Sequence, residues 1–163
     1  MRTSRQVVVV GNGMAGARLA TELAARPAGD PVRVRVTVFG DEPEPAYNRV
    51  LLSQVLAGNL PAGDTALPAP AGRTVDVHTG HRVVAIRPDR RIVAVRSRPG
   101  VEQEIGYDHL VLATGGRAIV PRLRGLDPDR LPDRVAVFRT LADCLRILAV
   151  ADQARTALVL GGG

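Results

Sequence analysis

The chain carries a complete glycine-rich turn near its start and the first half of a similar turn at its end. Four valines at 7–10 lead into Gly-Asn-Gly-Met-Ala-Gly at 11–16, and residues 157–160 lead into three glycines at 161–163. A strand, the spacing G-x-G-x-x-G and a helix together form a dinucleotide-binding fingerprint. One full copy and half of another predict a two-nucleotide enzyme that is truncated early in its second domain.

The three glycines of the first turn have separate physical roles. Gly11 permits a tight turn, Gly13 lets the main chain approach a pyrophosphate, and Gly16 allows a helix to pack closely on a strand. A helix is predicted over 14–26, because apolar residues recur at helical spacing and Pro27 follows. The N–H groups and dipole at its start would face the diphosphate.

An acidic pair follows the second predicted strand, at 32–39. In this fingerprint an acid after the second strand holds an adenosine ribose. Asp41 and Glu42 stand there, slightly beyond the ~20 residues that are typical of the motif. Because the two share one expected role, we expect one of them to be solvated. The alternative is a glycine-rich turn in an unrelated parallel α/β domain.

The rest of the hydrophobic pattern predicts an α/β fold, a Rossmann-like parallel sheet with an antiparallel three-stranded meander. A short helix is expected at 47–58, ended by Gly58, and a third parallel strand at 74–77. The meander is expected at 82–86, 91–95 and 101–105, and a buried strand at 109–115. A Pro- and Arg-rich crossover, a strand at 135–138 and a helix from Thr140 to about 151 follow.

Composition narrows the functional classes. The net charge is +6, but every basic residue is Arg, the basic residues are scattered and aromatic residues are only 2% of the chain, so we expect no nucleic-acid partner. No apolar run approaches the ~20 residues of a membrane span and no secretory signal is visible, so we expect a cytoplasmic protein without a membrane partner. The single Cys144 is expected to be a small buried hydrophobe, and the three histidines are not spaced like metal ligands.

The order of these motifs resembles the FAD- and NAD(P)-dependent pyridine nucleotide oxidoreductases with two dinucleotide-binding domains. The glycine turn, the acid, a Tyr-x-Arg-x-x-Leu-Ser segment at 47–53, the meander, an Ala-Thr-Gly strand and the second glycine turn occur in that family's order. Within the family, the run at 38–58 most resembles the large subunit of assimilatory NAD(P)H nitrite reductases. Ferredoxin and rubredoxin reductases are a poorer match.

The resemblance implies cofactor roles for the positions that match its motifs. The residues expected beside the FAD diphosphate all adjoin glycine turns, and they are Gly11, Gly13, Met14, Ala15, Gly16, Ala113, Thr114 and Gly115. Glu42, or Asp41, would bind the adenosine ribose. Val83, a strand residue in either case, would offer main-chain contacts to the adenine.

Two further places carry implied roles. Arg49 stands where the family has a flavin-contacting Arg just before a helix, the alternative being a solvent-facing cation. Gly161 and Gly163 would begin the NAD(P) site. No side chain needs to be a proton-transfer catalyst, since the cofactor carries the chemistry. We expect no catalytic residue and no metal ligand in this chain.

The departures from the family also carry information. Its disulfide reductases have two cysteines near the position of Arg49, and this chain has none there, so we expect no thiol–disulfide chemistry. The loop between Leu60 and Val77 is shorter than in the family and lacks an aromatic segment. The chain also lacks the cysteine-rich iron–sulfur and sirohaem regions that nitrite reduction requires.

These inferences predict an FAD-binding domain at 1–118, a crossover segment at 119–155 and the start of an NAD(P)-binding domain at 156–163. The whole enzyme would pass electrons from NAD(P)H through FAD to an acceptor domain or protein, either as a nitrite reductase or as a ferredoxin or rubredoxin reductase. The family completes its FAD domain with a later segment, so we expect this stretch to bind flavin weakly or not at all and to be inactive alone. The alternatives are a non-catalytic nucleotide-binding module and a single-nucleotide NAD(P)-dependent enzyme.

Overall fold

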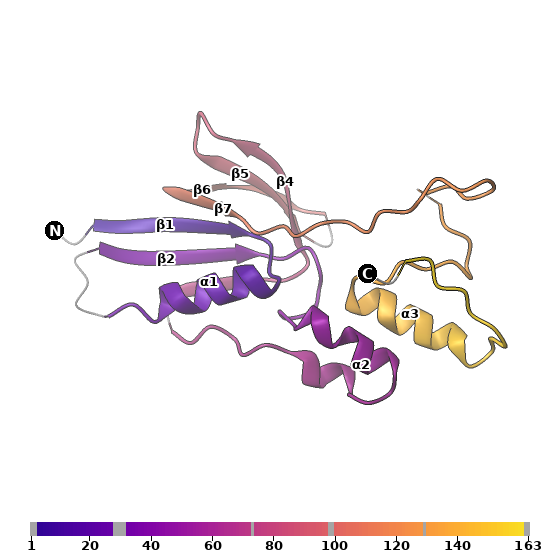
Figure 1. Cartoon of the computed structure of the whole chain (residues 1–163). Coiled ribbons are helices and arrows are strands. Elements are labelled where there is room, and N and C mark those ends of the chain that lie inside the picture. The colour runs from indigo at the N-terminus through magenta and orange to yellow at the C-terminus, as the bar shows by residue number, and fades with distance from the viewer. Residues whose placement is uncertain (1–2, 28–31, 73, 98–99, 129, 162–163) are drawn as a thin grey trace. The chain divides into compact units, whose positions relative to one another are not determined.

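A computed structural model describes residues 3–27, 32–72, 74–97, 100–128 and 130–161 (Figure 1). The chain divides into two compact units that are not consecutive in sequence. The first unit comprises residues 1–48 and 66–115, and the second comprises residues 49–65 and 116–163. Each unit is described by itself below.

The first unit is built on a parallel sheet of four strands. These are β1 (Thr3–Val10), β2 (Val32–Phe39), β3 (Val75–His78) and β7 (His109–Leu112), in the order β3-β2-β1-β7. Val10 lies opposite Phe39 on one side and opposite Leu112 on the other, so three strands end at one level. The predicted parallel sheet is confirmed, and β2 has the predicted bounds.

Toward their carboxyl ends the central strands β1 and β2 are packed on both faces, which explains why β1 lacks alternation of apolar and polar residues. On one face, Val7, Val9, Val36 and Val38 pack against Ala20 of α1 (Met14–Ala24). On the other face, Val8, Val10 and Phe39 pack against strands of the second sheet. Figure 1 shows α1 on one side of β1 and β2, and β4 and β5 on the other. Burying each such valine contributes about 1.5–3 kcal/mol.

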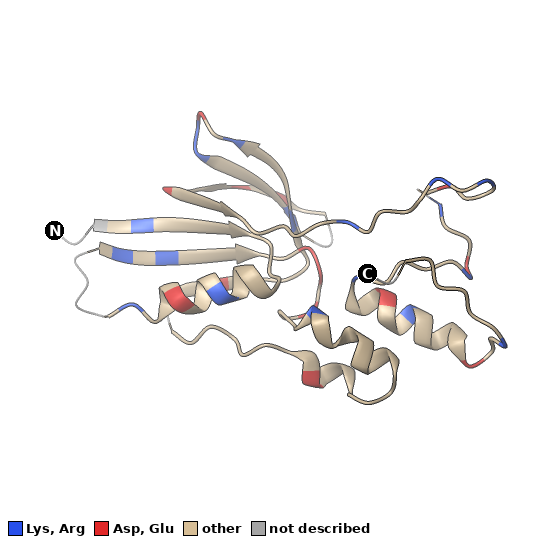
Figure 2. Cartoon of the chain, viewed as in Figure 1, with Lys and Arg blue, Asp and Glu red and all other residues tan. Residues whose placement is uncertain are grey.

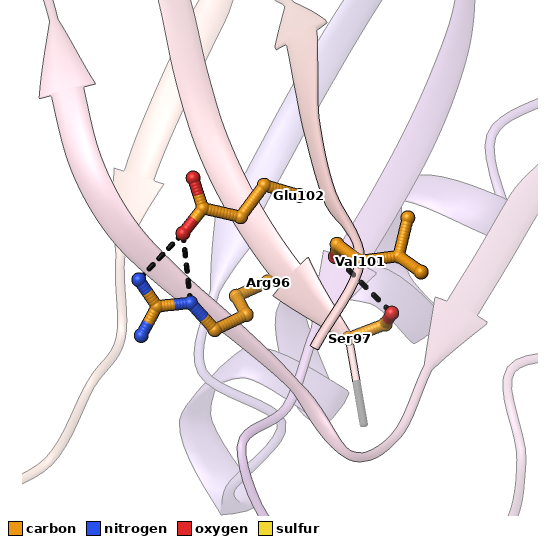
Figure 3. Close-up of polar contacts among 4 residues, drawn as sticks. All are labelled: Arg96, Ser97, Val101 and Glu102. Atoms are coloured by element: carbon orange, nitrogen blue, oxygen red, sulfur yellow. Dashed lines mark hydrogen bonds and ion pairs between the residues drawn. The ribbon is translucent and has the colours of Figure 1, made fainter. Parts of the chain in front are cut away.

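The second sheet of this unit is the predicted antiparallel meander. It consists of β4 (His81–Arg87), β5 (Ile92–Ser97) and β6 (Glu102–Gly106), in the order β4-β5-β6. Val93 and Val95 of β5 turn toward the parallel sheet and are fully buried. Figure 3 shows two contacts near the turn between β5 and β6: Arg96 donates to Glu102, the first residue of β6, and the Ser97 hydroxyl donates to the Val101 carbonyl at 3.2 Å.

The second unit contains two short helical segments and one longer helix. A 3₁₀ turn at Arg49–Leu51 runs into α2 (Leu52–Leu56), and a second 3₁₀ turn covers Ala62–Thr65. The helix α2 packs against α3 (Leu141–Ala151) through Leu52, Leu141 and Cys144, which are buried. Gly58 takes a φ of +75° after α2, as a helix-ending glycine does.

Thr140 begins α3 with a capping box. Its hydroxyl accepts from the Asp143 N–H at 3.1 Å, and the Asp143 carboxylate accepts from the Thr140 N–H at 2.9 Å. These contacts satisfy N–H groups that a helix start leaves without a partner. The predicted helix from Thr140 to about residue 151 is confirmed.

Two predicted strands are absent from the described part of the chain. At 135–138 the Val135 N–H donates to the Pro132 carbonyl in a turn, which removes it from any strand ladder. At 157–160 no strand is present in the described part of the chain, and Leu158 is 86% exposed. The prediction at 135–138 was wrong, because an apolar run becomes a strand only where another strand supplies hydrogen bonds. The strand at 157–160, as the expected start of an NAD(P)-binding domain, stays a prediction.

Candidate functional site

Three loops meet at the carboxyl edge of the parallel sheet. Gly11 follows β1, Gly40 and Asp41 follow β2, and Ala113 follows β7. The chain moves from β1 to β2 and β3 on one side and returns to β7 on the other side of β1. In open α/β sheets, ligands bind outside the carboxyl ends of the strands at this kind of switch point.

The loops after β1 and β7 are in direct contact. Gly11 has a φ of +113°, and its N–H donates to the Phe39 carbonyl at 2.8 Å. A Cβ at Gly11 would lie 2.2 Å from the Ala113 carbonyl oxygen. The Ala113 N–H in turn donates to the Val10 carbonyl at 2.8 Å. Position 11 therefore requires glycine for two reasons: its positive φ disfavours other residues, and a Cβ would clash with the Ala113 carbonyl.

Gly13 is different, because a Cβ there would meet no atom within 4 Å. It is the N-cap of α1, with extended backbone and no side-chain cap, and the first turn of α1 contains no acidic residue. Met14 and Ala15 are exposed in that turn. The start of α1 therefore combines open space with N–H groups and the positive end of a helix dipole, an arrangement that suits a diphosphate.

The two acids after β2 have different partners. Asp41 accepts two hydrogen bonds from Arg82 of β4, at 2.9 and 2.6 Å, and these bonds raise the pKa of the Arg82 guanidinium. Glu42 accepts a 2.6 Å hydrogen bond from the Tyr47 hydroxyl. Asp41 is exposed, whereas Glu42 is half-buried. Both carboxylates belong to the loop after β2, so neither is eliminated as the ribose ligand by its place in the chain.

Two other predicted contacts are placed in this unit. Thr114 and Gly115 are exposed and continue the loop after β7. Val83 lies on β4, which is an edge strand, and its side chain packs with the buried cluster of Val8, Phe39 and Val95. The pairing of β4 with β5 shifts register between Val83 and Ala85, so Val84 forms a bulge next to Val83.

Arg49 and Gly161 belong to the second unit. Arg49 is half-buried, and its guanidinium donates to the Arg139 carbonyl at 3.2 Å. Arg139 itself donates to the Gly116 carbonyl at 2.5 Å. Gly161 has a φ of +94°, a conformation that favours glycine, and Gly163 lies outside the described residues.

Within the described ranges, no group of three or more His, Cys, Asp or Glu residues is arranged to hold a metal ion. His78 stacks on Phe39 at a centroid distance of 5.2 Å, and the His81 ring contacts His78 edge-on at 5.3 Å. These two rings pack beside the end of β2 as part of the fold. None of the helices in the described segments combines the length and hydropathy of a membrane span.

Part of the basic surface is paired with acids. Arg18 contacts Glu22, Arg82 contacts Asp41, and Arg87 contacts Glu104. Figure 2 shows basic and acidic positions mixed along the strands and hairpins of the first unit. Within the described residues of the first unit, the start of α1 is therefore better suited to an anion than the mixed charged surface is.

Sequence reasoning overlooked two residues that organise the acid loop, Tyr47 and Arg82. In the sequence, Arg82 begins the strand expected at 82–86 and Tyr47 begins the Tyr-x-Arg motif, and neither position indicates a contact with an acid. One signal in the sequence could have pointed to Tyr47. The chain has only two tyrosines, and one of them stands five positions after Glu42. The tyrosine is only 5% exposed, which marks it as structural.

Comparison with known proteins agrees with this geometry. The family model described as "Pyridine nucleotide-disulphide oxidoreductase" matches residues 5–163. The chain is 33% identical to a "Nitrite reductase [NAD(P)H]" of Bacillus subtilis, over 98% of this chain and 19% of that protein. It is 31% identical to the "Biphenyl dioxygenase system ferredoxin--NAD(+) reductase component" of Paraburkholderia xenovorans, over 96% of this chain and 36% of that protein.

A solved structure shares the fold. The water-forming NADH oxidase of Lactobacillus brevis, bound to NADH, superposes with a TM-score of 0.77 at 24% identity, over 93% of this chain and 33% of that one. The chain thus spans about a fifth of its first curated relatives and a third of this structure. Because the family model covers nearly every residue, the chain belongs to the pyridine nucleotide-disulphide oxidoreductase family.

Proposed function

We propose that the chain is the FAD-binding portion of an NAD(P)H-dependent flavin oxidoreductase. The observation that carries the proposal is the convergence of the Gly11 turn, the acid loop after β2 and the loop after β7 at one sheet edge. The family match over residues 5–163 supports a nicotinamide-linked redox enzyme rather than another nucleotide-binding protein.

The residues present suit the adenosine diphosphate half of FAD. The start of α1 would take the diphosphate, because Gly13 leaves open space beside N–H groups that no side chain caps. Ala113 to Gly115 would line the same group from the β7 side. Glu42 or Asp41 would accept hydrogen bonds from the ribose hydroxyls, and the main chain beside Val83 would meet the adenine.

When bound, FAD would supply the redox chemistry, taking hydride from NAD(P)H and releasing electrons to an acceptor. This chain's residues would bind and orient it. Arg49 would lie near the flavin, and Gly161 and Gly163 would open the NAD(P) site. No side chain of the chain is required to transfer a proton.

The proposed acceptor chemistry follows the relatives. The 33% identity with a nitrite reductase favours an enzyme in which further domains receive the electrons. A second candidate, a reductase of a separate ferredoxin or rubredoxin protein, is favoured by the 31% identity with a ferredoxin–NAD(+) reductase component. Electron transfer from NADH to purified ferredoxin, with nitrite as the competing acceptor, separates the two in the enzyme that contains this chain.

Calorimetric titration of the chain with FAD, ADP and FMN tests the proposal. If the chain holds the adenosine diphosphate half of the cofactor, FAD and ADP bind with similar, weak affinities and compete with each other. FMN, which lacks the adenosine, does not bind. Binding of FMN without ADP would contradict the assignment, and tighter binding of NAD⁺ than of FAD would favour the single-nucleotide alternative.

A further inference from the structure

The two carboxylates after β2 are held by different groups. The Arg82 guanidinium donates hydrogen bonds to both carboxylate oxygens of Asp41, and both side chains are more than half exposed. Tyr47 donates its hydroxyl to one oxygen of Glu42 at 2.6 Å. This distance lies at the short end of the range for O–H···O hydrogen bonds. The structure therefore distinguishes two residues that the sequence leaves equivalent.

Tyr47 is fixed on the protein side. It is only 5% exposed, and its main chain forms an antiparallel bridge with Ala66. Beside it, the Ala46 carbonyl accepts from the Leu67 N–H at 2.8 Å. A buried ring on a paired backbone has little freedom, so its hydroxyl oxygen stays in one place.

Glu42 is fixed from its main chain as well. Its carbonyl accepts from the Gly80 N–H at 2.9 Å, which ties the acid loop to the turn before β4. A carboxylate has about four acceptor positions, and the bond from Tyr47 occupies one of them. The hydroxyl thus selects an orientation of the carboxylate.

We propose that Tyr47 is a positioning residue that holds the Glu42 carboxylate for the two hydroxyls of an adenosine ribose, while Asp41 serves as the structural partner of Arg82. This assignment rests on the proposed function, because it requires a nucleotide at the carboxyl edge. Tyr47 does not touch the nucleotide. It acts through Glu42. Because the carboxylate is already held in place, its side chain loses less conformational entropy when the ribose binds.

The test compares ADP with 2′,3′-dideoxy-ADP, which lacks both ribose hydroxyls, by calorimetry on the full chain. Wild type should bind ADP more tightly than the dideoxy compound, and Tyr47→Phe should reduce that preference by about fivefold, as the loss of one hydrogen bond does. The affinity of Tyr47→Phe for dideoxy-ADP should equal that of wild type. This equality separates positioning from a general loss of structure.

Matched variants of the two acids complete the test. Glu42→Gln should abolish the preference for ADP, and Asp41→Asn should retain it. Adding Tyr47→Phe to Glu42→Gln should change the preference no further, since the tyrosine acts through the acid. Each of these three results supports the assignment.

Several outcomes overturn it. If Tyr47→Phe keeps the wild-type preference for ADP, or if its affinities for ADP and dideoxy-ADP fall by the same factor, Tyr47 has no positioning role. The proposed function is not affected by that result. A preference lost in Asp41→Asn and kept in Glu42→Gln reverses the roles of the two acids. A wild type that binds neither ADP nor dideoxy-ADP contradicts the proposed function, and the positioning role falls with it.

Discussion

The carbonyl oxygen of Gly11 lies 2.0 Å from the point that a Cβ at Gly16 would occupy. Gly16 is buried in the first turns of α1, and the same point lies 3.1 Å from the Gly11 carbonyl carbon and 3.5 Å from the Val9 side chain. The helix can therefore approach the end of β1 only because residue 16 has no side chain. This approach points the start of α1 at the loops of the carboxyl edge.

Replacing Gly16 with alanine should destabilise the first unit. Main-chain atoms would have to move, and overpacking of this kind costs about 1–3 kcal/mol, more than the ~1 kcal/mol that alanine gains over glycine inside a helix. Urea unfolding monitored by circular dichroism measures the difference. Gly63→Ala is the control, because a Cβ there meets no atom within 4 Å. Equal stability of Gly16→Ala and wild type would contradict the packing argument.

Thr140→Ala should weaken the start of α3. The substitution removes the oxygen that accepts from the Asp143 N–H, and the loss of such a cap costs about 1 kcal/mol. The free energy of unfolding of the second unit is the quantity to measure. Thr140→Ser, which keeps the hydroxyl, should stay close to wild type, and a serine variant as unstable as the alanine variant would argue against the capping box.

Asp108 should make the first unit sensitive to acid. The Gln6 N–H donates to its carboxylate at 2.7 Å, and Arg5 lies nearby, so the pKa of Asp108 falls below its usual value of 3.8. A carboxylate with a lowered folded-state pKa stabilises the fold above the unfolded-state pKa, and this stabilisation disappears as the pH falls through the folded-state pKa. The difference in unfolding free energy between wild type and Asp108→Asn should shrink from pH 6 to below pH 4. A constant difference would show that the carboxylate charge contributes nothing.

Cys144 should resist thiol reagents in the folded chain. It is fully buried beside the Leu52 carbonyl, and burial raises the pKa of its thiol. Because the thiolate is the reactive form, labelling by Ellman's reagent at pH 8 should be slow and should accelerate on addition of urea. Labelling in buffer at the rate of a free peptide thiol would contradict the packing of α2 on α3.

The parts of the fold predicted correctly depend on local pattern. Residues 32–39 have strand character throughout and became β2 with the same bounds. Thr140 begins α3 as its N-cap, as predicted, and its capping box with Asp143 is formed within four residues of sequence. The strand expected at 135–138 is absent because the presence of a pairing strand is not a local property of the sequence.

In the candidate site too, contacts set by local sequence could be predicted, and contacts set by the path of the chain could not. The roles of Gly11 and Gly16 follow from a known spacing, and their close contacts with Ala113 and Gly11 agree with it. The pairing of Tyr47 with Glu42 and of Arg82 with Asp41 depends on how the chain returns at Ala66 and His81. No periodicity in the sequence encodes that return, so the distinction between the two acids appears only in three dimensions.

The measurement that tests the central claim most directly is ADP binding to wild type and to Gly13→Asp. Aspartate is a favoured N-cap and suits the positive end of a helix, so the variant should be as stable as wild type. Its carboxylate would occupy the open space at the start of α1 and repel a diphosphate. We predict that calorimetry finds ADP binding in wild type and at least about a tenfold loss in Gly13→Asp, as a lost anion contact of ~1.4 kcal/mol implies. Unchanged ADP affinity in a folded Gly13→Asp chain would contradict the claim that this turn holds the cofactor's diphosphate.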